Sequence, residues 1–174
     1  VTGATSGIGE EFCWQLAAAG HDLVLVARSE DALRALADSL ANVAGVRAEV
    51  IAADLSTDSG CARVSARLDV GGPADREKTD LAPVDLLVNN AGFGLGTEFL
   101  DNSLENEING LNVMVRAVMT LGHHAGISMR SRGRGAILNV GSVASRTGAG
   151  TYSAHKAWVV AFTEGLAAEL KGSG

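Results

Sequence analysis

The sequence predicts a doubly wound α/β fold, in which helices cover both faces of a parallel β-sheet. Short apolar runs that suit buried parallel strands alternate with longer patterns of helical spacing along the chain. A glycine-rich turn, Thr2–Gly9, stands at the start of the first helical pattern. Small polar turns follow two later strands, at the edge where open sheets of this class bind ligands. We therefore expect a ligand site along the carboxyl ends of the strands.

The length and composition are those of one folded domain. The chain has 174 residues, of which 47% are apolar and 20% charged, so it can bury a substantial core. A net charge of −6 argues against a nucleic acid or an anionic membrane as a partner. No apolar run approaches the ~20 residues that span a bilayer, and we find no secretory signal.

The two cysteines, Cys13 and Cys61, lie far apart and form no C-x-x-C pair. A disulfide framework or a zinc site is therefore not expected, which fits a reducing cytoplasm. The adjacent His123 and His124 point about 100° apart on a helix, and no carboxylate or cysteine clusters with them. We expect a cytoplasmic protein without a metal site, with these two histidines on a surface or an interface.

The first turn has the form of a phosphate-binding loop. Gly3, Gly7 and Gly9 fall at positions i, i+4 and i+6, and a helical pattern, Glu10–Ala19, follows and ends at Gly20. Glycine permits a tight turn, and a helix N-terminus offers free N–H groups and partial positive charge to a pyrophosphate. The alternative is an ordinary glycine-rich turn. The helix and strand that come next favour the phosphate loop.

The second predicted strand, Asp22–Ala27, ends at Arg28. In a dinucleotide fold an acidic residue near this point binds the ribose 2′-hydroxyl, whereas an arginine suits a 2′-phosphate. The strand tip carries no carboxylate, so the sequence favours NADP over NAD. The alternative is a solvated Arg28 that pairs with Glu30 or Asp31 nearby.

The next elements continue the alternation of helix and strand. Ser29 can cap a helix that runs to about Val43, and Arg47–Ala53 is the third predicted strand. Asp54 closes that strand. It could meet an adenine edge, or it could help to start the helix predicted over Ser56–Leu68.

The middle of the chain holds a loop, a strand and a long helical region. Gly71–Pro83 is polar and loop-like, and we assign it no chemistry. The fourth strand, Val84–Val88, runs into the amide-rich turn Asn89–Gly92, where an open sheet binds its ligand. Leu104–Met129 is expected to be helical, in two pieces that break near Gly110.

The fifth strand, Ala136–Val140, places Ser142 on the same rim of the sheet as Asn90. A glycine-containing loop then leads to Tyr152, which begins the sequence Y-x-x-x-K and a helical run to Leu170.

Tyr152 and Lys156 lie one helical turn apart and therefore point from the same face of their helix. A free phenol has a pKa of about 10, and a fixed ammonium beside it favours the phenolate. The pair is a plausible acid/base unit. The alternative is a surface helix with a half-buried tyrosine.

Four motifs in this order resemble those of the short-chain dehydrogenase/reductase family over the whole chain. They are T-G-A-T-S-G-I-G at Thr2–Gly9, N-N-A-G at Asn89–Gly92, Ser142 after a strand, and Y-S-A-H-K at Tyr152–Lys156. The resemblance implies a Rossmann-like sheet of strand order 3-2-1-4-5 and a single NAD(P)-binding domain over residues 1–174. The family's fold normally includes a full first strand and two more strands after Leu170, so we expect a domain that is incomplete at both ends.

The resemblance also implies catalytic roles. Tyr152 would give a proton to a carbonyl or take one from an alcohol, and Lys156 would hold the nicotinamide ribose. Ser142 would hydrogen-bond the reacting oxygen. Asn112 would support a proton-relay water, with Asn109 as its only close competitor. The cofactor-binding positions that it implies are Gly3, Ser6, Gly7, Ile8, Gly9, Arg28, Asp54, Leu55, Asn90, Ala91, Gly92, Tyr152 and Lys156.

These observations predict an NADP-dependent oxidoreductase that acts on a small carbonyl or alcohol. The resemblance implies a homo-oligomer formed through the long helices, around Leu111–Met129 and Tyr152–Leu170. One alternative is a non-catalytic nucleotide-binding module, which the short segment from Ser142 to Tyr152 would favour. The other is an α/β interaction domain that binds no nucleotide, which the intact glycine loop opposes.

Overall fold

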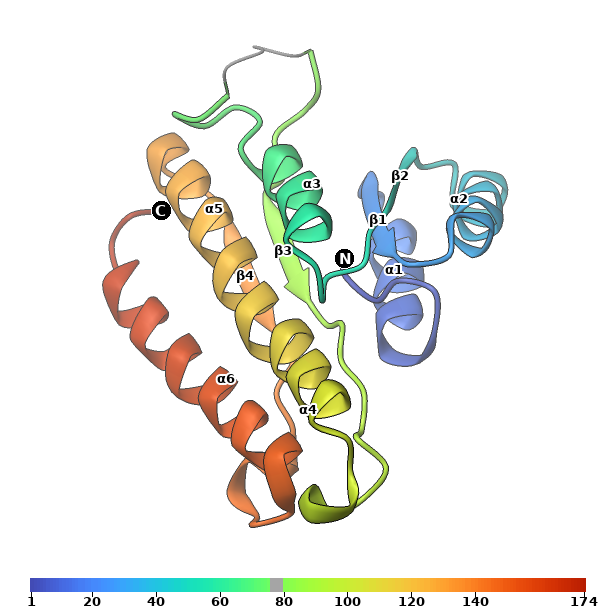
Figure 1. The fold of residues 1–174 in the computed structure, drawn as a ribbon. Coiled ribbons are helices and arrows are strands. Elements are labelled where there is room, and N and C mark those ends of the chain that lie inside the picture. Colours follow the sequence, from blue (N-terminus) through green and yellow to red (C-terminus); the bar gives the residue numbers. More distant parts are fainter. Residues whose placement is uncertain (76–79) are drawn as a thin grey trace.

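The structure is a computed structural model that describes residues 1–75 and 80–174 (Figure 1). Residues 76–79, within the predicted loop Gly71–Pro83, lie outside the described part. The strands are β1 (Leu23–Ala27), β2 (Ala48–Ala52), β3 (Leu86–Asn89) and β4 (Ala136–Asn139). The α-helices are α1 (Gly7–Ala18), α2 (Glu30–Ala44), α3 (Asp58–Leu68), α4 (Leu104–Leu111), α5 (Ala117–Arg132) and α6 (Gly150–Glu169). Shorter turns of helix are η1 (Phe99–Asp101), the π-helical turn η2 (Asn112–Arg116) and η3 (Val143–Arg146).

The first residues of the chain join two parallel strand pairs. β1 pairs with β2, and β3 pairs with β4. Thr2 bridges to Val26 of β1, and its N–H donates to the carbonyl of Val88 in β3 at 3.0 Å. On the other side, the N–H of Val26 donates to the carbonyl of Val1 at 2.9 Å. The predicted strand order 3-2-1-4-5 is therefore confirmed, with the first strand represented by the residues around Thr2.

Alternate residues of β1 serve two separate cores, as expected when helices cover both faces of a sheet. Leu23 and Leu25 pack with residues of α1 and α2, whereas Val26 packs with residues of α3 and α5. The first core comprises Ala4, Cys13, Ala17, Leu23, Leu25, Leu33, Leu36, Leu40 and Val46. The second comprises Val26, Ile51, Ala53, Leu55, Cys61, Val64, Leu68, Leu87, Ala117, Leu121, Ala125 and Met129.

Local capping agrees with the prediction at α2. The Ser29 hydroxyl accepts a hydrogen bond from the N–H of Ala32, and Gly45 ends the helix in a left-handed conformation at φ +70°. The helix after the glycine turn begins at Gly7, earlier than the predicted Glu10. Both cysteines, which were expected to be unpaired, are free and buried.

The sequence predicted that the long helical region breaks near Gly110, but the structure shows no break there. The helical region continues through the π-helical turn η2, in which the N–H of Ala117 donates to the carbonyl of Asn112, five residues back. A π-turn adds a residue to the helix without ending it, so α4 and α5 follow one another as a single column (Figure 1). Gly110 is instead a contact point, since a Cβ there would lie 2.8 Å from Leu95 and 3.6 Å from the His155 ring.

Within residues 1–75 and 80–174, no helix is both long and apolar enough to cross a membrane. The same residues hold no group of three or more histidine, cysteine, aspartate or glutamate side chains that could bind a metal.

Candidate active site

The glycine turn is shaped by three different constraints. Gly3 and Gly7 have φ values of +66° and +54°, a region that residues with side chains rarely adopt. A Cβ on Gly9 would lie 2.1 Å from the carbonyl oxygen of Gly3 and 2.4 Å from Asn90 Nδ2. Helix α1 can therefore pack this closely against the turn only if residue 9 is a glycine, which has no side chain. A Cβ on Gly7, by contrast, would meet nothing within 4 Å, so a ligand can reach the backbone there.

The start of α1 is open to solvent or to an anion. Ser6 is the N-cap residue and is exposed, yet its side chain makes no capping hydrogen bond. Ile8 is 63% exposed. The first N–H groups of a helix have no partner within it and carry partial positive charge. The predicted residues Ser6, Gly7 and Ile8 thus form an open helix terminus of the kind that binds phosphate groups.

The predicted residue Asn90 holds the glycine turn itself. Its Nδ2 donates to the carbonyl oxygens of Thr2 at 3.0 Å and Gly3 at 3.4 Å. In return, the Thr2 hydroxyl accepts from the N–H groups of Asn90 and Ala91, each at 3.0 Å, and donates to the Val88 carbonyl at 3.3 Å. Thr2 was not among the predicted site residues. The available signal was its place in the motif, directly before Gly3.

The tips of β1 and β2 present a cation and an anion. Arg28 is exposed and forms no ion pair with any described residue. Glu30 bonds Arg34 instead, at 2.5 Å, so the proposed pairing of Arg28 with Glu30 is wrong. The N–H of Ser56 donates to Asp54 and lowers the pKa of that carboxyl, with a smaller contribution from Arg28.

Asp54 also helps to start α3, because its carbonyl accepts from both the N–H and the hydroxyl of Thr57. The adjacent Leu55 is 6% exposed, and its side chain packs in the core. From this pair, only Asp54 and the Leu55 backbone can reach a ligand at the strand tips.

Three segments meet at Lys156. Lys156 is 6% exposed, and its ammonium donates to the carbonyl of Val140 at 2.8 Å and lies 6.0 Å from the centre of the Tyr152 ring. A Cβ on Gly92 would lie 3.7 Å from Lys156 Nζ. Helix α6, the end of β4 and the turn after β3 are thus brought together. Burial lowers the pKa of Lys156.

Ser142 lies between β4 and the turn η3, which packs against α6. Its hydroxyl oxygen accepts from the N–H of Ala144 at 3.1 Å. A hydroxyl carries one donor and two acceptor sites, so the Ser142 proton stays free to donate. The predicted plain loop between Ser142 and Tyr152 contains this helical turn.

Asn112 begins the π-helical turn η2, against which α6 packs. Its side chain is half-buried, as is that of Asn109 in α4. π-turns occur often at functional sites. The position of Asn112 at the turn distinguishes it from Asn109, which lies in regular helix.

A family model of the short chain dehydrogenases matches residues 1–174. The chain belongs to the short-chain dehydrogenase family. It is 33% identical to the bulky-bulky ketone specific alcohol dehydrogenase from Comamonas testosteroni, with a TM-score of 0.90, over 100% of this chain and 67% of that one. A short-chain dehydrogenase from Sphingobium yanoikuyae in complex with NADPH is 35% identical, with a TM-score of 0.90, over 100% of this chain and 65% of that one.

The 7beta-hydroxysteroid dehydrogenase of Collinsella aerofaciens is 30% identical over 100% of this chain and 63% of its own length. This short-chain dehydrogenase chain therefore spans about two thirds of the length of these relatives.

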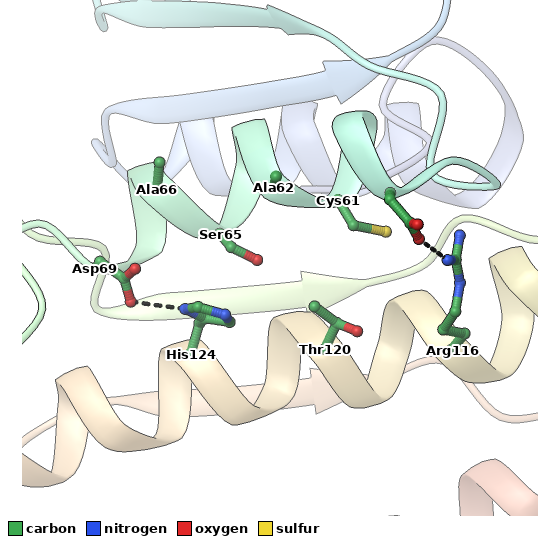
Figure 2. Close-up of a pocket in the computed structure, with 9 residues that line it drawn as sticks. Cys61, Ala62, Ser65, Ala66, Asp69, Arg116, Thr120 and His124 are labelled. Atoms are coloured by element: carbon green, nitrogen blue, oxygen red, sulfur yellow. Dashed lines mark hydrogen bonds and ion pairs between the residues drawn. The ribbon is translucent and has the colours of Figure 1, made fainter.

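Away from the glycine turn and Lys156, this short-chain dehydrogenase has a hollow between α3 and α5, with a volume of about 370 Å³ (Figure 2). Its polar side chains pair with one another: Arg116 bonds Asp58, and His124 Nδ1 lies 2.9 Å from Asp69 Oδ1. Its lining residues do not include Tyr152, Lys156 or any residue of the glycine turn. We interpret these pairs as helix-to-helix contacts, which gives His124 a structural role.

The tight contact at Gly9 predicts a large loss of stability for Gly9→Ala. The new methyl group would overlap the Gly3 backbone, so we expect a loss of about 2–4 kcal/mol, in the range of strained core substitutions. Gly165→Ala is the matched control, since it lies in helix α6 with nothing within 4 Å and should stabilise by about 0.5–1 kcal/mol. Urea denaturation measures both. Equal stabilities would contradict the close approach of α1.

Proposed function

We propose that the protein is an NADP-dependent oxidoreductase that interconverts a ketone and a secondary alcohol, with residues 1–174 as its nucleotide-binding domain. The observation that carries the proposal is the meeting of α6, the end of β4 and the turn after β3 at the buried Lys156, beside Tyr152. The meeting point of these segments lies at the carboxyl ends of the strands, where open α/β sheets bind their ligands.

The glycine turn and its neighbours fit a dinucleotide phosphate. Gly7 leaves open space at the start of α1, where the exposed N–H groups would hold a pyrophosphate. Arg28 is an exposed cation without an ion-pair partner in the described chain, which suits a 2′-phosphate. Asp54 would lie beside the adenine, and Ala91 and Gly92 would line the rest of the cofactor.

A bound nicotinamide would supply or accept the hydride. Tyr152 would donate its phenolic proton to the oxygen of a ketone during reduction, and would take the proton back during oxidation. The Lys156 ammonium would place a positive charge beside the reacting groups, and its hydrogen bond to the carbonyl of Val140 holds it there. Ser142, whose proton is free, would donate to the same substrate oxygen.

Asn112 would support the proton-relay water, because it begins the π-helical turn η2, which packs against α6. The ketone substrate class is supported by two relatives, whose names state a ketone specific alcohol dehydrogenase and a hydroxysteroid dehydrogenase.

Replacement of the tyrosine tests the proposed chemistry. Tyr152→Phe removes the phenolic proton and leaves the ring, so kcat for ketone reduction should fall by about 10²–10⁴-fold, the usual contribution of a general acid. NADPH absorbance follows the reaction with a panel of bulky ketones. An unchanged circular dichroism spectrum serves as the control for folding. Full activity in Tyr152→Phe would contradict the proposal.

Cofactor choice depends on the charge at the tip of β1. Arg28→Ala should weaken NADPH binding by about tenfold to a hundredfold and leave NADH binding unchanged, because a bond between charged groups contributes about 1.5–3 kcal/mol. Cofactor fluorescence measures both affinities. Arg34→Ala is the control, as Arg34 is exposed but paired with Glu30. A parent protein that prefers NADH would refute this role of Arg28.

The helices α4 and α5 carry an exposed apolar stripe, which supports a homo-oligomer. Leu104, Ile108, Leu111 and Met119 are 68%, 50%, 47% and 47% exposed and follow helical spacing. An apolar stripe of this kind on a helix is typical of a surface that a partner covers. We propose that a second copy of the protein covers it.

Ile108→Lys should convert the oligomer to a monomer, because it places a charge in the middle of the stripe. Analytical ultracentrifugation gives the mass. Glu105→Lys is the control from the same helix, at an exposed polar position. If the protein is already a monomer before substitution, the proposed interface is wrong.

A further inference from the structure

Helix α6 carries Tyr152 and Lys156, yet its own sequence does not cap its start. The N-cap residue Ala149 makes no side-chain hydrogen bond, and the first turn contains no acidic residue. Gly150 has a φ of +68°, so the chain enters the helix through a left-handed residue. A helix start with these properties leaves N–H groups without partners and favours a negative charge nearby.

Glu107 of α4 supplies a negative charge to this first turn. It is 6% exposed, and both of its carboxylate oxygens accept hydrogen bonds. One oxygen accepts from the hydroxyl of Thr151, the residue before Tyr152. The other accepts from Asn102 Nδ2 at 2.6 Å. A buried carboxylate is tolerated when its oxygens are bonded in this way, so the contact is specific.

The same network reaches the loop that follows β3. Asn102 Oδ1 accepts from Asn106 Nδ2 at 3.0 Å, and Asn106 Nδ2 also lies 3.4 Å from the carbonyl of Leu95. Glu107 is therefore the charged member of a chain of hydrogen bonds that joins this loop, α4 and the start of α6. A shift of one segment would break a bond in the others.

The next turn of α6 rests against the same helix. His155 follows Thr151 by one turn, is 6% exposed and packs near Gly110 of α4. Its burial lowers its pKa, with the charge of Glu107 acting in the opposite direction and that of Lys156 reinforcing the shift. The His155 ring fills the contact between the helices. Among the described residues its Nδ1 has no hydrogen-bond partner.

Thr151 and His155 are the residues directly before Tyr152 and Lys156. Successive residues on a helix point about 100° apart, so fixing one face of α6 fixes the direction of the neighbouring face. A misplacement of about 1 Å in a catalytic group can lower a rate by about a hundredfold.

We propose that Glu107 is a positioning residue, which holds the first turn of α6 through Thr151 and thereby aims Tyr152 into the site. Its effect on turnover rests on the proposed function. Its effect on the Tyr152 ring does not, and can be measured separately.

Tyr152 is the only tyrosine in the chain, so a tyrosine label reports on this ring alone. With 3-fluorotyrosine incorporated, the 19F NMR spectrum of the 174-residue chain should show one narrow resonance. In Glu107→Gln the side chain keeps one acceptor oxygen where the carboxylate has two, so the resonance should broaden or split. Thr151→Val, which removes the hydroxyl at nearly constant volume, should do the same. Thr151→Ser should restore the parent spectrum.

Glu105→Gln is the matched control, because Glu105 is an exposed residue of the same helix. Its spectrum should match that of the parent. Unchanged spectra in both Glu107→Gln and Thr151→Val would overturn the proposal. If Glu107→Gln fails to fold by circular dichroism, the milder pair Thr151→Val and Thr151→Ser decides the question alone.

Kinetics form the second arm of the test. Glu107→Gln and Thr151→Val should lower kcat for a reduced ketone by about tenfold to a hundredfold and leave KM for NADPH within about twofold, because the glycine turn is untouched. A fall in kcat with an unchanged 19F spectrum would contradict positioning. If the parent reduces no ketone while the variants still alter the spectrum, the proposed function fails and the positioning role stands.

Discussion

The hydroxyl of Thr2 is the interaction on which the site most depends. Its proton goes to Val88, and its two acceptor positions take the N–H groups of Asn90 and Ala91. All the hydrogen-bonding capacity of a hydroxyl is therefore used, in a position that is 2% exposed. This one group joins the glycine turn to the turn after β3. Two loops far apart in sequence become a single rim of the sheet.

Close approach between backbones shapes the rest of that rim. Gly9 lets α1 touch the turn at Gly3, and Gly92 lets its own turn pass within contact distance of Met114 and Lys156. Larger residues would separate these segments. Because the packing is tight at Gly9 and Gly92, the open space at Gly7 stands out as the place where a ligand can meet the helix terminus. Gly9 and Gly92 thus allow segments to pack closely, whereas Gly7 leaves the backbone at the start of α1 open.

Two of the hydrogen bonds that hold helix α6 involve residues on either side of Tyr152 in the sequence. Lys156 is bound to the carbonyl of Val140, at the end of β4, and Thr151 is bound to Glu107 of α4. The first contact ties the helix to the sheet and the second to the helix beside it. Tyr152 lies between these two anchors in sequence. The helix on both sides of Tyr152 is therefore anchored to two separate elements, as in rigid scaffolds that orient a side chain through its neighbours.

Local sequence patterns predict the helices and strands and their order along the chain. The Ser29 cap, the glycine turn and the Y-x-x-x-K spacing depend on neighbours within about one helical turn, and local periodicity encodes them directly. Which distant groups become partners depends on how the elements pack: Asn90 bonds the glycine turn, and Glu107 bonds Thr151. The last contact joins residues 44 positions apart, between two helices. Contacts of that range arise when the faces of separate elements pack together, and a glutamate in a helical pattern looks the same whether it meets water or a buried hydroxyl.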